Sequence, residues 1–296
     1  MPSAVLIGSL IRELLTCKRS PRIPEPGLVM DDPEQVSAYV SAGREHGVMA
    51  PVYLFHGANI CEVIRPGDTV LDLACGPANQ LALVARLNPE TRFIGMDLSK
   101  PMLQQAEELI AQQGLANVSF RHGDITDLSE FPGASIDAVM STMALHHLPD
   151  AQALARVYAE VARVLKIGGG VYMVDFSHLR LGSSIEYFAY QYADRQPALF
   201  TTDYLNSLHA AFYLDDIRLA VQPLAQRARL HTTFLVPYMA ALKSPGRRGE
   251  DLALEDIALK AELVKMAQNL PDWHKADFAD LKTFFGLGGL TCSLLR

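Results

Sequence analysis

Short apolar runs alternate with segments of helical periodicity through the middle of the chain. Each run holds five to seven residues and is bounded by turn-forming or charged residues, which predicts buried strands. The predicted strands are Thr69 to Ala74, Arg92 to Asp97, Val118 to His122, Ile136 to Ser141 and Gly170 to Phe176, and the predicted helices between them are Asn79 to Leu87, Lys100 to Gln113 and Ala151 to Leu165. This alternation is typical of a parallel sheet with helices on both faces. We therefore expect an α/β fold whose ligands bind beyond the carboxyl ends of the strands.

The chain begins with a segment that is predicted to be an amphipathic helix, Ala4 to Leu15. Helical spacing places Ile7, Leu10, Ile11 and Leu14 on one face. That face could pack on the body of the protein, on a partner subunit or at a membrane surface.

A linker and two further helices are predicted before the first strand. Ser20 to Gly27 is too rich in proline to hold a helix or a central strand. An N-cap at Asp31 and Asp32 predicts a helix to Ala42, and another helix is expected from Pro51 to Ile64. Basic residues gather beside the first helix and are expected to lie in solvent: Arg12, Lys18, Arg19 and Arg22.

The segment after the fifth strand is unusually aromatic. Eight aromatic residues fall between positions 187 and 213: Tyr187, Phe188, Tyr190, Tyr192, Phe200, Tyr204, Phe212 and Tyr213. A lid over an apolar pocket or a homodimer contact would each bury them. The sequence leaves both explanations open.

The rest of the chain predicts a helix, a broken pair of strands and a C-terminal extension. The helix covers Leu214 to Ala225, the strand pattern of Arg229 to Lys243 is broken at Pro237, and Ser244 to Glu250 predicts a second linker before a helix from Leu252 to Gln268. We therefore divide the chain into a helical N-terminal extension (1–64), a sheet domain (65–244) with a helical cap insertion (177–213), and a helical C-terminal extension (245–296).

Composition narrows the function and the location. The 26 Lys and Arg against 33 Asp and Glu give a net charge of −7, which argues against nucleic-acid binding by the whole surface. No run approaches the roughly 18 apolar residues that a membrane-spanning helix needs, and the first residues lack the pattern of a secretion signal. The four cysteines form no CxxC pair, so we expect no disulfide framework and no metal site, in a cytoplasmic protein.

The turn after the first strand carries the sharpest chemical signal. The segment Val70 to Asn79, VLDLACGPAN, covers the end of a predicted buried strand, an acidic residue followed by small residues, and the start of a helix. Small residues let a ligand approach the backbone closely. The spacing does not match GxGxxG, Pro77 removes one amide donor, and Asp72 would repel a phosphate. The turn therefore favours a cationic or zwitterionic ligand over a dinucleotide.

Two more acids follow the next two strands. Asp97 ends the second strand, where a carboxylate can accept hydrogen bonds from both ribose hydroxyls. Asp124 follows the third strand, where it can accept from an adenine amino group while Ile125 packs on the ring. Three acids at three consecutive strand ends indicate a nucleoside-binding site more strongly than any one of them alone.

The motifs VLDLACGPANQ, FIGMDLSKPML, HGDITDL, IDAVMSTMALHHLPD and GGGVYMVDF together resemble the class I S-adenosylmethionine-dependent methyltransferases. The resemblance covers about a third of the chain and points to the branch of ubiquinone/menaquinone C-methyltransferases and natural-product methyltransferases. It implies a Rossmann-like, seven-stranded, mostly parallel sheet. It also implies a seventh, antiparallel strand, which Arg229 to Lys243 could provide with its hairpin partner.

The resemblance also implies S-adenosyl-L-methionine as cofactor and a role for most of the strand-end residues. Asp72, Ala74 and Gly76 would surround the methionine part, Asp97 would hold the ribose, Leu98 and Ile125 would flank the adenine, and Asp124 would contact its amino group. The predicted cofactor site is completed by Cys75, Asn79, Ser141 and Met143. Two features depart from the family: Ala74 and Ala78 stand where glycine is usual, and Ser141-Thr142-Met143 replaces the signature that grips bases in many DNA methyltransferases.

Catalysis by such an enzyme needs alignment and, for a protic acceptor, one base. His146 and His147 follow the fourth strand and His178 follows the fifth, so each is a candidate base or substrate-orienting group. Each could equally be a cap, a packed ring or a surface residue, and Asp175 a hydrogen-bonding cap. The predicted substrate-binding residues are Tyr39, Tyr53, His56, Tyr187 and Tyr190, and each is equally plausible as core.

The sequence thus favours an S-adenosylmethionine-dependent methyltransferase that acts on a small, partly apolar or aromatic molecule by in-line displacement. It does not reveal the acceptor atom, since carbon, nitrogen, oxygen and sulfur are all methylated on this fold. The alternatives are a catalytically silent cofactor-binding or scaffold subunit, a protein-directed methyltransferase and, on a similar sheet, a nicotinamide-dependent oxidoreductase.

Overall fold

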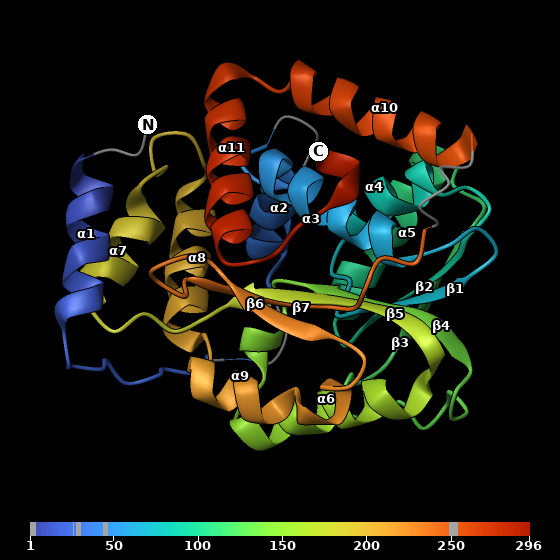
Figure 1. The fold of residues 1–296 in the computed structure, drawn as a ribbon, viewed down its shortest axis with the longest axis horizontal. Helices are drawn as coiled ribbons and strands as arrows, with labels where there is room; N and C mark the ends of the chain where they lie inside the picture. Colours follow the sequence, from blue (N-terminus) through green and yellow to red (C-terminus); the bar gives the residue numbers. More distant parts are fainter. Residues whose placement is uncertain (1–3, 26, 28–30, 44–46, 249–253) are drawn as a thin grey trace.

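Seven strands form one mixed sheet at the centre of the protein (Figure 1), in the order β3-β2-β1-β4-β5-β7-β6. The computed structural model describes residues 4–25, 27, 31–43, 47–248 and 254–296. The strands are β1 (Thr69–Leu73), β2 (Arg92–Asp97), β3 (Val118–His122), β4 (Ile136–Thr142), β5 (Leu165–Phe176), β6 (Arg229–Thr232) and β7 (Met239–Lys243). The first five pair in parallel, and β7 is antiparallel to both β5 and β6. The predicted seven-stranded, Rossmann-like sheet is confirmed.

The helices also follow the predicted pattern closely. They are α1 (Ala4–Leu15), α2 (Pro33–Ala42), α3 (Ala50–Val63), α4 (Asn79–Leu87), α5 (Lys100–Gln113), α6 (Ala151–Val164), α7 (Gly182–Tyr190), α8 (Ala198–Ala210), α9 (Leu214–Ala220), α10 (Leu254–Asn269) and α11 (Asp272–Leu287), with single 3₁₀ turns at Leu145–His147, Gln222–Leu224 and Ser293–Leu295. Asp32 caps α2 as expected, accepting hydrogen bonds from the amides of Glu34 and Gln35 at 3.0 Å. The predicted linker positions 249–250 and the predicted helix start at 252 lie outside the described residues.

Two boundaries differ from the prediction by five residues. The helix α9 ends at Ala220 instead of Ala225, because Pro223 lies in a separate 3₁₀ turn, Gln222–Leu224. The strand β5 begins at Leu165 instead of Gly170. Leu165 pairs with Ile136, after which the register shifts before Gly170 pairs with Ala138. Gly168 has a φ of +73°, a conformation that glycine adopts without steric cost. The glycines at this irregularity are typical of a turn, which is why the sequence predicted that the strand begins only at Gly170.

The two faces of the sheet are covered by different helices (Figure 1). Successive side chains of a strand point to opposite faces, so Tyr172 joins one apolar cluster and Met173 the other. The first cluster includes residues of α3, α4, α7, α10 and α11, and the second includes residues of α6 and α9. Both terminal extensions therefore share a core with the sheet.

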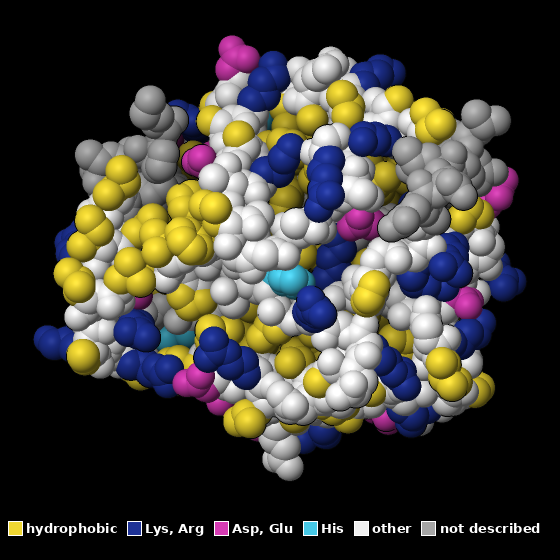
Figure 2. Space-filling view, in the orientation of Figure 1, with side chains coloured by type: hydrophobic (Ala, Val, Ile, Leu, Met, Phe, Trp, Pro, Cys, Tyr) yellow, Lys and Arg dark blue, Asp and Glu magenta, His cyan; other side chains and the backbone are white. Residues whose placement is uncertain are grey.

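The apolar face of α1 is only partly covered. Leu10 packs against the first cluster, whereas Ile7, Ile11 and Leu14 keep 46%, 50% and 46% of their surface exposed. Figure 2 shows apolar side chains gathered over α1 and the neighbouring α7. Packing on the body therefore accounts for only part of the predicted apolar face. Among the described residues, no helix is both long and apolar enough to cross a membrane.

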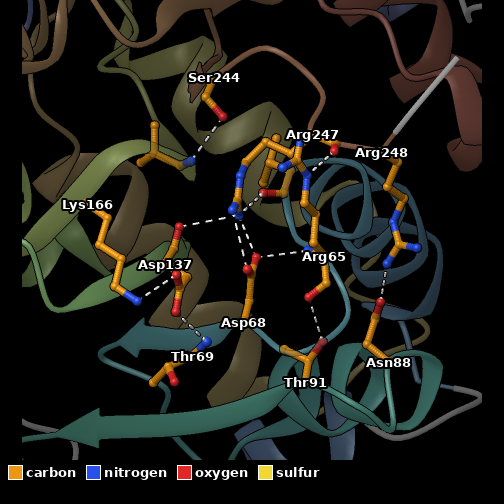
Figure 3. Close-up of polar contacts among 12 residues, drawn as sticks. Arg65, Asp68, Thr69, Asn88, Thr91, Asp137, Lys166, Ser244, Arg247 and Arg248 are labelled. Atoms are coloured by element: carbon orange, nitrogen blue, oxygen red, sulfur yellow. Dashed lines mark hydrogen bonds and ion pairs between the residues drawn. The ribbon is translucent and has the colours of Figure 1, made fainter.

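The second predicted linker is docked on the amino-terminal edge of the sheet (Figure 3). Arg247 forms a buried ion pair with Asp68, 2.5 Å between Nη1 and Oδ2, and donates to the carbonyl oxygens of Val63 and Asp137. Arg65 donates to the carbonyl oxygen of Arg247. The charged side chains of this segment thus bind it to the sheet, on the edge opposite the strand ends where ligands are expected.

Candidate active site

A cavity of about 310 Å³ opens at the carboxyl ends of β1 to β4. The strand-end residues that the sequence predicted for a cofactor line it: Asp72, Ala74, Cys75, Gly76, Asn79, Asp97, Leu98, Asp124, Ile125 and Met143. Parallel strands bring their carboxyl ends to one edge, so turns that are far apart in the sequence meet there. We call this space the strand-end cavity.

The turn after β1 is held in a strained shape by the protein around it. Ala74, Gly76 and Ala78 have φ values of +53°, +53° and +63°, in the left-handed region. A left-handed alanine costs roughly 1–2 kcal/mol relative to an ordinary conformation, and backbone strain of this kind clusters at functional sites. The two alanines therefore adopt the conformation for which the family usually has glycine.

Asp97 ties the first two strand ends together. Its Oδ2 accepts a hydrogen bond from the amide of Gly76 and its Oδ1 accepts one from the amide of Ser99, each at 2.8 Å. A carboxylate has about four lone-pair directions, so acceptor capacity remains for a ligand in the cavity that it lines. Asp97 is therefore both a structural link and an available acceptor.

Two buried acids give the strand-end cavity its electrostatic character. Burial raises the pKa of Asp72 well above its ordinary value, and the nearby charge of Asp97 raises it further. Burial also raises the pKa of Asp97, although amide hydrogen bonds from Ser99 and Gly76 oppose the shift. Among the described residues, neither carboxylate is paired with Lys or Arg. A positively charged ligand would relieve this unpaired negative charge.

Replacing Asp72 with Asn should stabilise the ligand-free protein at neutral pH, by an amount on the order of 1 kcal/mol. The pKa of this carboxyl is higher in the folded protein than in the unfolded chain, so between the two pKa values the folded state binds more protons. The free energy of unfolding therefore falls as the pH rises from the unfolded pKa to the folded pKa. The increase in the free energy of unfolding that Asp72→Asn causes should therefore be largest above the pKa of Asp72 in the folded protein. It should vanish below the pKa of Asp72 in the unfolded chain. Urea unfolding at several pH values measures this increase, and Glu107→Gln, at an exposed position, is the control. Equal stability of Asp72→Asn and the parent protein at every pH would refute the prediction.

A second cavity, of about 220 Å³, lies beside the first, and we call it the aromatic cavity. Its wall includes Phe176, Phe188, Phe200, Tyr192, Tyr204 and Tyr238. Four of these six residues belong to the predicted aromatic insertion, which forms α7, α8 and the turn between them. The two cavities meet at Tyr39, Met143 and His147, which line both.

His146 presents one ring nitrogen at this junction. Its Nδ1 lies 2.7 Å from Oδ1 of Asp175, whose Oδ2 accepts the backbone amide of His146 at 2.8 Å. An ionised carboxylate can only accept, so Nδ1 is the donor in this bond and Nε2 is the nitrogen that points away from Asp175. Nε2 is buried and has no hydrogen-bond partner, and His146 lines the aromatic cavity. Asp175 therefore fixes both the orientation and the tautomer of this ring.

His147 is a neutral imidazole beside it. Burial lowers its pKa to about 3, with His146 lowering it and Asp175 raising it by smaller amounts. The ring centroids of His146 and His147 are 4.4 Å apart. Both histidines thus lie where the sequence suggested, and Asp175 orients the ring of His146.

Five predicted site residues lie away from both cavities. Ser141 is fully buried and its hydroxyl donates to the carbonyl of Leu73 at 2.9 Å, because its side chain faces the neighbouring strand. His56 lies in the core, 2.7 Å from the hydroxyl of Tyr172, and burial lowers its pKa to about 3. His178 contacts Ser20 instead of a cavity. Tyr187 packs beside Phe188, and Tyr190 is 54% exposed. By contrast, Tyr53 lines the strand-end cavity and Tyr39 lines both.

Sequence reasoning predicted the first linker but missed that it is docked on the protein, which it crosses as a strap (residues 19–25). Arg22 donates to the carbonyl oxygens of His146, Leu148, Pro149 and Ala210 at 2.6–3.1 Å, and its guanidinium lies 3.9 Å from the ring centroid of Phe212. Arg22 is therefore not a solvated surface charge, contrary to the expectation for its basic group. It anchors the strap and brings Glu25 close to the two histidines.

Comparison with known proteins identifies the central part of the chain. Residues 70–169 match the family model described as a methyltransferase domain. The demethylmenaquinone methyltransferase of Geobacillus sp. (strain WCH70) is 34% identical over 115 residues, which are 38% of this chain and 47% of that protein. The nocamycin O-methyltransferase of Saccharothrix syringae is 37% identical over 100 residues, 33% of this chain and 35% of that protein. Residues 70–169 therefore match a methyltransferase domain.

The solved structures show the same fold for the methyltransferase domain. The crystal structure of a SAM-dependent methyltransferase from Aquifex aeolicus superposes with a TM-score of 0.51 at 16% identity, covering 73% of this chain and 98% of that one. The curated matches span about half of the Geobacillus protein and about a third of the Saccharothrix protein. The matched family region, residues 70–169, runs from β1 into β5, whereas α1, α2, α3 and all elements after β5 lie outside it.

Proposed function

We propose that the protein transfers a methyl group from S-adenosyl-L-methionine to a small, partly apolar or aromatic molecule. The observation that carries this proposal is the junction of two cavities at Tyr39, Met143 and His147. One cavity has the strand-end acids of the methyltransferase domain, and the other is walled by aromatic side chains. In-line displacement requires donor and acceptor to meet at one point with water excluded.

The strand-end cavity has the side chains that the cofactor needs. When bound, S-adenosylmethionine supplies a methyl group already activated on a sulfonium sulfur. Asp97 is the proposed acceptor for the ribose hydroxyls, Leu98 and Ile125 the proposed walls around the adenine, and Asp124 the acceptor for its amino group. Buried Asp72 would place its charge near the cationic methionine part.

The aromatic cavity favours an acceptor with flat apolar surface and at least one polar group. Its wall is mostly apolar, but Asp203, Ser207 and the Nε2 atom of His146 offer polar contacts. The pKa of Asp203 is raised to about 6, mainly by burial and to a smaller extent by the carboxylates of Glu25 and Asp32. A hydroxyl or amine on the acceptor would find a partner here, whereas a protein segment would need a wider opening than a cavity of about 220 Å³.

Filling the aromatic cavity should stop methyl transfer without weakening cofactor binding. Leu281 of α11 lines that cavity and Leu287, on the same helix, is 60% exposed. We expect Leu281→Trp to lower methyl transfer at least about tenfold, because the larger indole would occupy space that the acceptor needs, and each loss of about 1.4 kcal/mol of binding is tenfold. Transfer of labelled methyl groups to a panel of hydroxylated and amino-substituted aromatic molecules measures this, and Leu287→Trp is the matched control.

The same experiment separates the alternatives. Binding of S-adenosylhomocysteine by titration calorimetry, together with transfer that Leu281→Trp abolishes and Leu287→Trp retains, supports the proposal. Binding without transfer to any small molecule in the panel or in cell extracts would favour a silent or scaffold subunit. No binding by the folded protein would disprove the proposed activity.

A further inference from the structure

Three potential metal ligands lie close together beside the aromatic cavity, and two of them, His146 and His147, line it. Glu25 of the strap and His146 and His147 of the 3₁₀ turn each offer a ligand atom, and these atoms all lie within 4.8 Å of one another. Two imidazoles and one carboxylate are a ligand set that first-row transition metals accept, with other coordination positions left open. This group was not foreseen from the sequence, because Glu25 is 121 residues away from His146.

The state of His146 is a second and independent indication of a ligand. The residue is 2% exposed, and its Nε2 is buried without a hydrogen-bond partner. A buried polar atom without a partner costs about 1–3 kcal/mol, which a bound ion would relieve. Asp175 holds the opposite nitrogen, Nδ1, at 2.7 Å. This carboxylate-histidine arrangement is the one that orients and strengthens metal-binding histidines.

The surroundings favour a cation. Among the described residues, Glu25 pairs with no Lys or Arg, and its Oε1 accepts a hydrogen bond from the hydroxyl of Ser207 at 3.3 Å. Asp203 adds a second carboxylate to the wall of the aromatic cavity. The guanidinium of Arg22 donates to backbone carbonyl oxygens and forms no ion pair with Glu25, so it leaves the carboxylate of Glu25 open to a cation.

We propose that Glu25, His146 and His147 bind one divalent first-row transition cation whose open coordination positions face the aromatic cavity. Ligands lie about 2.0–2.2 Å from zinc, so the three side chains must move together slightly on binding. Metal binding itself is independent of methyl transfer. A role for the bound ion in catalysis rests on the proposed function.

In that role the ion would bind a hydroxyl oxygen of the acceptor and lower the pKa of the hydroxyl. The O–H proton leaves to water, the oxygen attacks the methyl carbon, the O–CH₃ bond forms and the C–S bond breaks. Sulfur keeps the electron pair and leaves as a neutral thioether, so charge and atoms balance. The substrate class is therefore a small molecule with a hydroxyl group, or two neighbouring oxygens, on an apolar frame.

Titration of the chelator-treated full-length protein with Zn²⁺ tests the site. We expect one bound ion per chain. Glu25→Gln and His146→Gln should each weaken Zn²⁺ binding at least about tenfold, and Asp175→Asn about 10- to 100-fold. The matched controls are Glu107→Gln, exposed on α5, and His231→Gln, on edge strand β6, both of which should leave the affinity unchanged.

Two further readouts separate this inference from the proposed function. S-adenosylhomocysteine binding should persist in Glu25→Gln, because Glu25 does not line the strand-end cavity; its persistence also shows that the variant folds. Chelation of the parent enzyme should lower methylation of hydroxylated acceptors, with recovery on adding metal. Absence of Zn²⁺ binding, or binding that neither Glu25→Gln nor His146→Gln weakens, would overturn the site. Full activity after chelation would overturn its catalytic role, even if S-adenosylhomocysteine binds normally.

Discussion

Replacing Asp97 with Ala is expected to weaken S-adenosylhomocysteine binding by about 100-fold or more. Hydrogen bonds to a charged acceptor contribute about 1.5–3 kcal/mol each, and Asp97 is the proposed acceptor for two ribose hydroxyls. The carboxylate also fixes the turns after β1 and β2 through the amides of Gly76 and Ser99. The substitution therefore removes both ligand contacts and the support of the cavity wall. Titration calorimetry on the purified variant measures the loss.

Asp127→Ala is the matched control for this experiment. Asp127 follows the same strand as Asp124, but it is exposed and does not line the strand-end cavity. The control should bind S-adenosylhomocysteine as the parent does. Thermal unfolding must show that Asp97→Ala is folded at the titration temperature. A folded Asp97→Ala protein with less than a tenfold loss of affinity would contradict the assignment of the ribose site.

Replacing Arg247 with Ala is expected to destabilise the protein by about 3–5 kcal/mol, the cost of leaving one partner of a buried ion pair without the other. The side chains of Arg247 and Asp68 are 13% and 8% exposed, so solvent screens the pair weakly. Arg247 also donates to the carbonyl oxygens of Val63 and Asp137 and joins the segment after β7 to the sheet (Figure 3). Urea unfolding followed by circular dichroism measures the change.

Two companion variants show whether the buried pair is the cause. Arg229→Ala removes an exposed arginine from edge strand β6 and should change stability by less than about 0.5 kcal/mol. The double variant Asp68→Asn with Arg247→Ala should be less destabilised than the sum of the two single changes, because the second substitution removes the charge that the first leaves unpaired. Additive effects would mean that the ion pair contributes nothing of its own.

Local patterns in the sequence were sufficient for most of the fold. The strands β1 to β4 and the helices α4 to α6 lie within one residue of their predicted ends, since burial on both faces requires continuous apolar runs and amphipathic helices. The same alternation placed Asp72, Asp97 and Asp124 at one edge of the sheet, because the carboxyl ends of parallel strands come together there. Ser141 is predicted from the sequence to line the cofactor site, but its side chain faces a neighbouring strand. A shift of one residue along a strand reverses the direction of the side chain, and the sequence does not determine the strand end to within one residue.

The sequence by itself determined the sheet, the order of its elements and the acids at its strand ends, all of which follow from periodicity and from residues close together in the chain. Only the tertiary structure decided which distant side chains meet. Docking of the strap through Arg22 brings Glu25 to His146 and His147, and docking of the second linker pairs Arg247 with Asp68. Neither contact has a period or a spacing that a sequence can display, because each depends on how separately formed elements pack around the same sheet.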